Sequence, residues 1–306
     1  MTDFELALGA HPSPDPSLAL QAPNLPAPPD SERPLYKVQY VVELVGKRSE
    51  KAPVMERILD DDWTQALGRP LVYVMTPLED RWRTFRRGIA PTVDSLCLCW
   101  PVLGQSGRLT QASAQKLLDQ AQTFANPLAR RAMPLPPPMD IDSCASKLGE
   151  LVECLDIGFG LCAQAPTQVP EREIWRAMAD LGLTFEPDGA FRWIVGGRRL
   201  IEVTPLDSDA FSAQAAAAGS TQQGISVGFN MPHCAAPLES LAACFRVAQL
   251  VAQRIGGSVL DGDGNPVGAG YEQEMTSNMR QALDSFQRAG LPPGSAEAFT
   301  LFPSEP

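Results

Sequence analysis

One stretch of the sequence, residues 224–261, constrains the fold more than any other, because it predicts a strand, a turn, a long helix and a second strand in immediate succession. From Ile225 to Met231, apolar residues alternate with small or polar ones, the pattern of a strand with one buried face. From Leu238 to Ile255, apolar residues recur at helical spacing along one stripe. Gly256-Gly257 ends the helix, and Ser258–Asp261 returns as a short strand. The stretch therefore predicts a sheet that packs against a helix.

Size and charge limit the fold and the partners. The chain has 306 residues, 44% of them hydrophobic, which is enough for about two domains with packed cores. Its net charge of −11 opposes binding to a polyanion, so we expect no nucleic-acid partner. No apolar run approaches the roughly 20 residues that a membrane-spanning helix needs, so we expect no direct membrane span.

The cysteines indicate the compartment in which the protein works. Seven are scattered along the chain without a C-x-x-C pair, a pattern typical of reduced thiols in a cytoplasmic protein. Zinc and a disulfide framework are both disfavoured. Cys97 and Cys99 share one face of a predicted strand, where they are interpreted as small core residues rather than ligands. We expect a cytoplasmic protein without a cofactor.

Both halves of the chain predict one order of elements: a strand, a helix, two or three strands and a long helix. In the first half, strands are expected at 37–45, 71–75, 81–87 and 96–103, and helices at 55–67 and after the N-cap Thr110. In the second half, strands are expected at 154–162, 184–194 and 200–206 besides the stretch above, and helices at 140–152, after Pro170 and at 271–289. The repeated order predicts a domain duplication. The expected class is α+β, with two tandem antiparallel-rich sheets that each carry helices on one face.

The domain boundaries follow from the distribution of proline. Residues 1–34 are proline-rich and predict a disordered tail that cannot bury enough surface to fold alone. The run P-L-P-P-P at 134–138 breaks the chain between the two copies. We expect a first, diverged copy at 35–133, a second copy at 140–292 and a C-terminal tail at 293–306.

A family resemblance rests on three segments of the second half. The strand G-I-S-V-G-F-N-M-P, the helix F-R-V-A-Q-L-V-A-Q-R-I-G-G and the closing S-V-L-D-G-D-G-N-P resemble the C-terminal FtsZ-binding domains of the ZipA family, over about residues 157–291. The resemblance implies a non-enzymatic cell-division adaptor that binds the C-terminal peptide of FtsZ, with other divisome proteins as further partners. It also implies recruitment to the division septum at the inner face of the cell membrane. ZipA proteins carry an N-terminal transmembrane anchor, and the sequence predicts an adaptor without its own.

The resemblance also implies where the peptide binds, on the helix-free face of the sheet. Leu206 keeps the apolar character of a family methionine, whereas Gly228 stands where the family has a phenylalanine and Asp188 where it has a methionine. These departures predict a weakened apolar groove with a flat surface of small residues. The residues expected on this face are Gly158, Gly160, Cys162, Glu202, Thr204, Leu206, Ser226, Gly228 and Asn230.

Two alternative functions remain open at this point. One is a ZipA-like scaffold whose helix-free face is covered by the first copy or by a tail. The other is a binder of nucleic acid or acidic peptides through Arg81–Arg87, where arginines alternate with Trp82 and Phe85. The simpler interpretation of that segment is a solvated face of an edge strand.

Signatures of chemistry are weak along the whole chain. The histidines are His11, in the tail, and His233, which precedes Cys234; adjacent residues rarely form a nucleophile–base pair, so a turn is the expected role. The segment from Asp261 to Asn265, with Glu272 downstream, resembles the start of a calcium loop. It follows a strand rather than a helix, so a turn is favoured there as well. We expect neither an enzyme nor a metal site.

Overall fold

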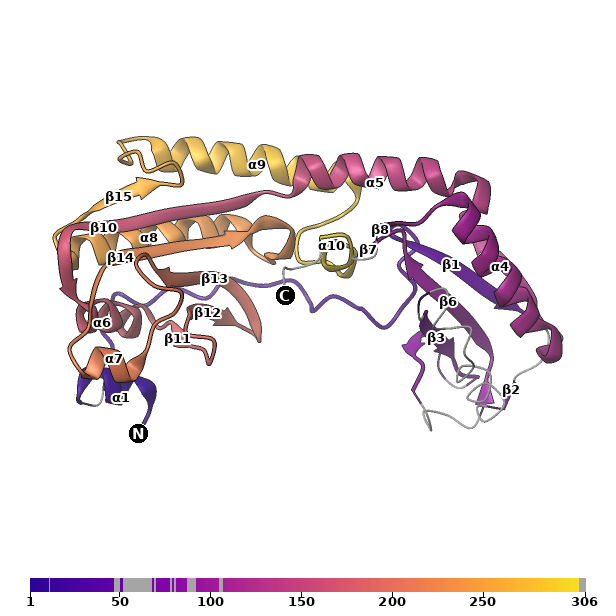
Figure 1. Ribbon diagram of the computed structural model, residues 1–306, viewed down its shortest axis with the longest axis horizontal. Coiled ribbons are helices and arrows are strands. Elements are labelled where there is room, and N and C mark those ends of the chain that lie inside the picture. Colours follow the sequence, from indigo (N-terminus) through magenta and orange to yellow (C-terminus); the bar gives the residue numbers. More distant parts are fainter. Residues whose placement is uncertain are drawn as a thin grey trace. The chain divides into compact units, whose positions relative to one another are not determined.

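The computed structural model describes residues 1–10, 12–46, 50–51, 68, 70–77, 79, 81–86, 92–104 and 107–302. The chain divides into two compact units, each built around one main sheet (Figure 1). Unit 1 comprises Met1–Ala27 and Leu155–Gly294, and unit 2 comprises Pro28–Cys154 and Ser295–Pro306. Antiparallel sheets with helices confirm the predicted α+β class.

Unit 1 contains a six-stranded antiparallel sheet. The strand order is β11 (Thr184–Phe185), β12 (Phe191–Val195), β13 (Arg198–Pro205), β14 (Thr221–Asn230), β10 (Gly158–Pro170) and β15 (Ser258–Asp261). The strand expected at 154–162 therefore begins four residues later, because Cys154 is still part of the preceding helix α5 (Ile141–Leu155). The interruption expected near Pro187 is the turn between β11 and β12.

Helices cover one face of this sheet. α6 (Glu171–Leu181) and α8 (Pro237–Ile255) pack on β10 and β14, and α9 (Tyr271–Ala289) packs on α8. The apolar stripe predicted for α8 is buried, and the Phe245 ring lies 5.8 Å from Phe159 and 6.1 Å from Tyr271. Gly256 ends α8 in the left-handed conformation, with φ of 63°, as its C-cap role requires.

Unit 2 contains a five-stranded antiparallel sheet. The strand order is β4 (Arg83–Thr84), β3 (Leu71–Met75), β6 (Ser95–Pro101), β1 (Gln39–Val45) and β9 (Arg131–Leu135). α4 (Gln111–Ala125) packs on β1 and β9, and Thr110 caps it by accepting a hydrogen bond from the Ser113 amide at 3.2 Å. The Tyr40 hydroxyl donates to the Ala114 carbonyl at 3.2 Å, which places this side of β1 against α4.

The smaller elements connect these layers. In unit 2, β2 (Glu50–Lys51) pairs with β5 (Thr92–Val93), and β7 (Leu103–Gly104) with β8 (Gly107–Arg108). The short helices are α7 (Ala213–Ala217), α10 (Ala296–Leu301), η1 (Asn126–Leu128), η2 (Pro138–Asp140) and η3 (Met231–His233).

The two sheets share the order of their four central strands. In unit 2 this order is β3-β6-β1-β9, and in unit 1 it is β13-β14-β10-β15. In both units the long helix joins the second of these strands to the fourth, as α4 joins β6 to β9 and α8 joins β14 to β15. The outer strand differs, because β4 follows β3 in the chain whereas β12 precedes β13. The common connections support the proposed duplication.

The N-terminal segment differs from the expected tail. Residues 3–8 form a helix, α1 (Asp3–Leu8), which packs against α6 and α7 in unit 1. The segment cannot fold alone, but it folds on the surface of unit 1. Phe4 lies against the rings of Trp175 and Phe191, and Ala7 is buried.

The other boundaries also differ from the expected ones. Pro134 and Pro136 end the edge strand β9, but the chain remains in unit 2 through α5 and enters unit 1 only at Leu155. The expected C-terminal tail contains α10, which belongs to unit 2 and buries Leu301 and Phe302. Proline thus marks the end of a strand here rather than a domain boundary.

Some expectations fall outside the described residues, namely the helix at 55–67, His11 and Arg87. Among the described residues of the segment expected as a strand at 81–87, Arg83–Thr84 pairs with β3, and the Phe85 amide donates to the Val72 carbonyl at 2.7 Å. Within the part of the chain that the structure describes, no helix has the length and apolar character needed to cross a membrane.

Candidate functional site

The helix-free face of the unit 1 sheet, hereafter the open face, gathers the residues expected to bind peptide. Across the strands, Glu202 is opposite Gly228, which is opposite Gly160. One step along, Thr204, Ser226 and Cys162 form a second row, which continues to Leu260 on β15. A third row pairs Asn230 with Gly158. The register therefore places eight of the nine expected residues on shared rows, these being Gly158, Gly160, Cys162, Glu202, Thr204, Ser226, Gly228 and Asn230.

Burial shows which side of the sheet these rows occupy. Their sequence neighbours Leu161, Val203 and Val227 have exposed fractions of 0% and point to the helix layer. The residues of the rows themselves are half-buried or exposed. Leu206, the ninth expected residue, follows β13, and its amide donates to the Gly224 carbonyl at 3.2 Å. Leu206 is half-buried and thus extends the open face at one end.

Gly228 is required by the close approach of two strands. A Cβ at this position would overlap the Phe159 carbonyl oxygen and lie 3.2 Å from the Gly160 Cα. Gly224, four residues earlier on the same strand, is constrained in the same way, because a Cβ there would overlap the Ala163 carbonyl oxygen. The missing phenylalanine therefore has a physical reason in this chain, because β10 and β14 leave no room for any side chain at 228.

Gly158 and Gly160 differ from Gly228 although they lie on the same face. A Cβ at Gly158 would meet nothing within 4 Å, and at Gly160 only the Val227 carbonyl oxygen at 3.9 Å. Both positions therefore have space above them. The open face has a flat strip at its centre that a peptide backbone or an aromatic side chain can approach closely.

A charged cluster borders this strip, and sequence reasoning missed its centre, Arg192. Arg192 as a whole is 5% exposed, and its guanidinium group donates to Glu202 through Nε at 2.7 Å and to Asp188 at 2.7 Å. Glu186 lies 3.9 Å away. The hydrogen bond from Arg192 lowers the pKa of Asp188 below its ordinary value.

The cluster changes the interpretation of Asp188. The resemblance placed it where the family has an apolar residue, and the structure places it in the β11–β12 turn, paired with Arg192. The alternation of Phe191, Arg192 and Trp193 in a short strand could have shown that Arg192 faces away from the core. Its carboxylate partners come from two other segments, so no local pattern identifies them.

Cys162 and Ser226 form a polar pair in the second row. Burial raises the pKa of the Cys162 thiol, and the hydrogen bond with Ser226 opposes part of that shift. The thiol is therefore protonated at neutral pH and acts as a small, weakly polar surface group rather than as a nucleophile.

The arginine segment of unit 2 does not form the basic platform considered above. Arg83 is paired with Glu79 at 2.6 Å, and Arg86 lies 3.8 Å from Glu32. Trp82 packs against a buried cluster formed by Val41, Tyr73, Cys97 and Cys99. An indole ring committed to the core cannot stack on a base, so the described part of this segment resembles an ordinary strand surface.

The candidates for chemistry have structural roles. Cys234 is buried, and its Sγ lies 3.1 Å from Ser240 Oγ; burial raises the pKa of its thiol, and the hydrogen bond with Ser240 opposes part of that shift. The Asp261 carboxylate accepts hydrogen bonds from the backbone amides of Asp263 and Asn265, the geometry of an Asx turn. Across the described residues, no group of His, Cys, Asp and Glu side chains is arranged to hold a metal ion.

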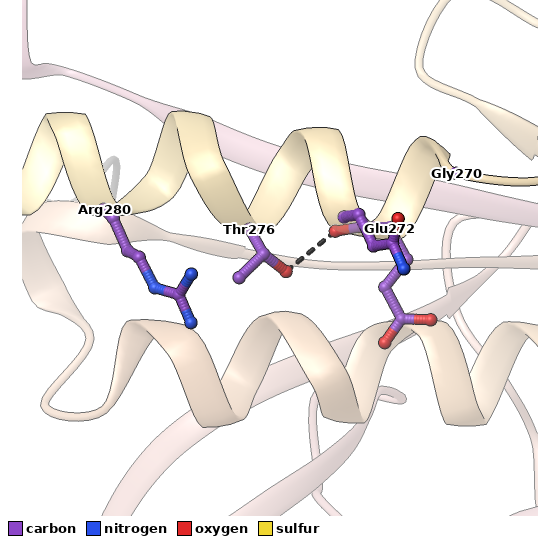
Figure 2. Close-up of a pocket in the computed structure, with 5 residues that line it drawn as sticks. Gly270, Glu272, Thr276 and Arg280 are labelled. Carbon is purple, nitrogen blue, oxygen red and sulfur yellow. Dashed lines mark hydrogen bonds between the residues drawn. The ribbon is translucent and has the colours of Figure 1, made fainter.

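A wide, open hollow of about 540 Å³ lies along α9 and is lined by Gly270, Glu272, Gln273, Thr276 and Arg280 (Figure 2). Its lining is mainly polar, and the Thr276 hydroxyl is already engaged by the Glu272 carbonyl at 2.7 Å. It lacks the apolar walls with convergent polar groups that characterise ligand sites. The open face is the better candidate.

Comparison with known families agrees with this choice of unit. Residues 156–278 match the family model of the ZipA C-terminal FtsZ-binding domain, and the match covers every strand of the unit 1 sheet together with α6 and α8. No curated protein matches the chain. The match confirms that residues 156–278 are similar to the ZipA C-terminal FtsZ-binding domains, a family of protein-binding rather than catalytic modules.

Proposed function

We propose that this protein is a cell-division adaptor that binds the C-terminal peptide of FtsZ on the open face of unit 1. The observation that carries the proposal is the family match over 156–278, since the matched segment contains the complete sheet that forms this face. The free space above Gly158 and Gly160 supports it, because a peptide can lie close to the strands there.

The expected affinity is low. Peptide grooves gain affinity from buried apolar area, at about 25 cal/mol per Å². The open face has Leu206 and Leu260 as apolar contributors, but Gly228 cannot carry a side chain. We expect a dissociation constant on the order of 10 μM to 1 mM.

The alternative of a face covered by the N-terminal tail finds no support in unit 1. α1 packs against α6 and α7, and the Arg246 guanidinium on α8 donates to the carbonyls of Ser17 and Leu18. The segment therefore follows the helix layer, on the side opposite the open face. Removal of this segment is not needed for the peptide to reach the face.

The test is fluorescence anisotropy of a labelled FtsZ C-terminal peptide with the full chain. Gly160→Asp should abolish binding, because it places a carboxylate on the strip where the peptide would desolvate it without a partner. Gly160 suits this purpose, whereas Gly228→Asp would disrupt the strand pair itself.

Gly268→Asp is the matched control, since Gly268 also has nothing within 4 Å of its Cβ position and lies outside the sheet. It should bind as the wild type does. Equal affinity in Gly160→Asp and wild type would place the peptide elsewhere, and no binding by the wild-type chain at millimolar concentration would refute the proposed function.

A further inference from the structure

The N-terminal helix α1 packs on the surface of unit 1, against α6 and α7. An isolated helix of six residues is not stable in water, so α1 depends on the surface beneath it. Its ends are nevertheless well formed: Thr2 and Glu5 make a capping box, and Gly9 closes the helix in the left-handed conformation. A defined helix with little intrinsic stability indicates a specific docking surface.

The docking surface is a groove between α6, α7 and β12. Phe4 is the anchor, with its ring 5.6 Å from Trp175 in an edge arrangement and 5.7 Å from Phe191. Three positions later on the same side of α1, Ala7 is 4% exposed. α1 packs there against α7, whose sequence A-Q-A-A-A allows two helices to approach closely.

The chain after α1 continues along the helix layer as an extended strap. The Leu20 amide donates to the Leu181 carbonyl at 3.1 Å, and the Asp15 amide donates to Asp180 at 3.2 Å. Leu25 reaches the β12–β13 turn, where it lies 4.0 Å from the Cβ position of Gly196. In these hydrogen bonds Asp15 and Leu20 take part through their backbone amides, which is typical of a peptide bound on a surface rather than of a core element.

The groove is larger than the helix that occupies it. Beside α1 lies an open hollow of about 250 Å³, to which α1 contributes Asp3 and Leu6 and the groove contributes Phe185, Pro187 and Phe211 among others. Its lining is more polar than apolar, since Asp3, Asp188 and Ser212 line it as well, and Phe211 is buried.

We propose that this groove is a second peptide-binding site of the protein, whose ligand is a short amphipathic helix with the pattern of α1. The pattern is an aromatic residue at the position of Phe4 and a small residue at that of Ala7. Residues 1–27, hereafter the arm, occupy the site within the same chain, and the arm of a second copy fits it equally, because the contacts do not depend on which chain supplies it. The site meets the charged border of the open face at Asp188, but it does not depend on the function proposed for that face.

The experiment measures binding of a labelled synthetic peptide of residues 1–27 to the full chain. In the wild type the attached arm competes at a high effective concentration, so binding of the free peptide is weak. Phe4→Ala in the chain weakens its own arm and should raise the affinity for the free peptide by at least about tenfold. Gln21→Ala, at an exposed position of the strap, is the control and should behave as the wild type.

Changes in the peptide define the site. A peptide with Phe4→Ala should fail to compete, because it lacks the ring that contacts Trp175 and Phe191. Equal peptide affinity for the wild-type and Phe4→Ala chains, or no binding to a Phe4→Ala chain with wild-type circular dichroism, overturns the proposal.

A second measurement keeps the proposal testable if Phe4→Ala does not fold. In hydrogen exchange of the wild-type chain, excess free peptide should accelerate exchange of the chain's own amides in residues 3–9, because the peptide displaces the attached arm. Unchanged exchange at saturating peptide contradicts the proposal.

Discussion

The sheet face opposite α8 in unit 1 and the sheet face opposite α4 in unit 2 differ in chemistry, although the central strands are ordered alike. In unit 1 this face consists mainly of glycine and small or polar residues and carries one cluster of paired charges, with Leu206 and Leu260 at its ends. In unit 2 the corresponding face of β1, β3, β6 and β9 is mainly apolar, with Glu43 among its residues. Its rim exposes large side chains, with exposed fractions of 40–52%, from Val45, Leu71, Met133 and Leu135.

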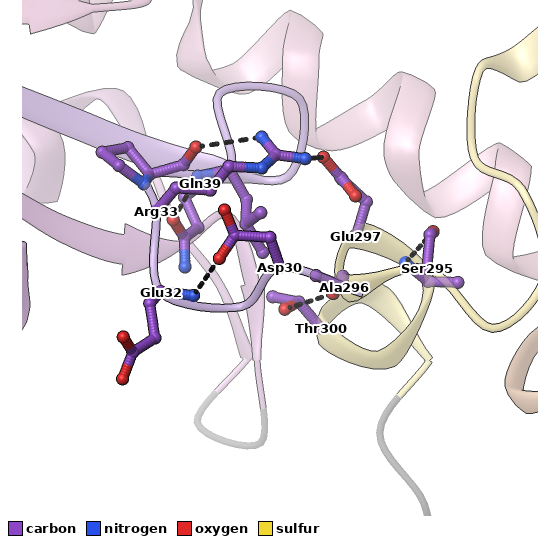
Figure 3. A network of polar contacts seen from close by, with 11 residues as sticks. Asp30, Glu32, Arg33, Gln39, Ser295, Ala296, Glu297 and Thr300 are labelled. Atoms are coloured by element: carbon purple, nitrogen blue, oxygen red, sulfur yellow. Dashed lines mark hydrogen bonds and ion pairs between the residues drawn. The ribbon is translucent and has the colours of Figure 1, made fainter. Parts of the chain in front are cut away.

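The centre of the unit 2 face is covered by the chain itself. Val41, Cys97 and Cys99 are fully buried there. Tyr36, which precedes β1, lies over this face and donates from its hydroxyl to Glu43 at 2.6 Å. Beside it, Arg33 donates to Glu297 of α10 at 2.7 Å (Figure 3).

The two units limit the exposed apolar area of this sheet face in two different ways. Unit 2 keeps the apolar residues and covers most of them with neighbouring segments, whereas unit 1 replaces them with small and polar residues and leaves the face accessible. Exposed apolar surface is typical of interaction sites, and unit 2 has such surface at its rim, so the chemistry of the two faces does not by itself choose between them. The family match over 156–278 favours unit 1, and the following predictions test it.

The largest effect is expected in the core that joins the unit 1 sheet to its helices. Phe245→Ala should lower the free energy of unfolding of unit 1 by about 3–5 kcal/mol, because it removes a buried ring between β10 and α9. Leu117→Ala in α4 should do the same to unit 2, by about 2–5 kcal/mol.

Hydrogen exchange resolved by segment measures the two units separately. Gln249→Ala, exposed on the same helix as Phe245, is the control and should change little. Equal loss of protection in both units from either core substitution would mean that they unfold together, and the comparison of independent units would fail.

The next effect concerns the glycines of the open face. Gly228→Ala should destabilise unit 1 by about 1–3 kcal/mol, because its Cβ overlaps the backbone of β10. Gly160→Ala, one strand away on the same row, should stay within about 0.5 kcal/mol of the wild type, since its Cβ has free space. Urea denaturation compares the two. Similar midpoints would show that close strand approach is not the reason for glycine at 228.

A smaller effect, on peptide affinity, is expected when the open face of unit 1 receives an apolar side chain and the rim of the unit 2 face receives a charge. Gly160→Phe places an apolar ring on the open face of unit 1 and should raise the affinity for the FtsZ peptide by about tenfold. Met133→Asp on the rim of unit 2 should leave that affinity unchanged. The reverse result in anisotropy, with binding lost in Met133→Asp and unaffected by Gly160→Phe, would assign the peptide to unit 2.

The sequence predicted the elements of unit 1 well, because their patterns are local. The bounds expected for β15 and α9 match those observed, and α8 differs by one residue at its start. The rows of the open face also followed from strand alternation. The role of Gly228 did not, since the clash that requires glycine involves a carbonyl of a strand distant in sequence.

Contacts between distant segments account for the other differences. The arm resembles a disordered tail because its composition cannot support a core, and it folds only on Trp175 and Phe191. Arg192 resembles an ordinary surface residue until Asp188 and Glu202 are brought to it by the sheet. Composition indicates whether a segment can fold alone, whereas the structure of these segments depends on contacts with distant parts of the chain.

The smallest predicted effect is a change in the rate of thiol labelling at Cys162. This thiol lies half-buried in the second row of the open face, beside Ser226, and burial raises its pKa. Because the thiolate is the reactive form, Cys162 should react with maleimide more slowly than the exposed Cys154, and its rate should increase as the pH rises towards the raised pKa.

Bound FtsZ peptide should slow labelling of Cys162 a further few-fold and leave Cys154 unchanged, since only the first lies on the open face. The free arm peptide, which binds on the helix side, should slow neither. Mass spectrometry of the labelled chain distinguishes the two cysteines. If the arm peptide protected Cys162 from labelling, the two peptides would share one site. If saturating FtsZ peptide did not protect Cys162, the FtsZ peptide would bind away from the second row of the open face.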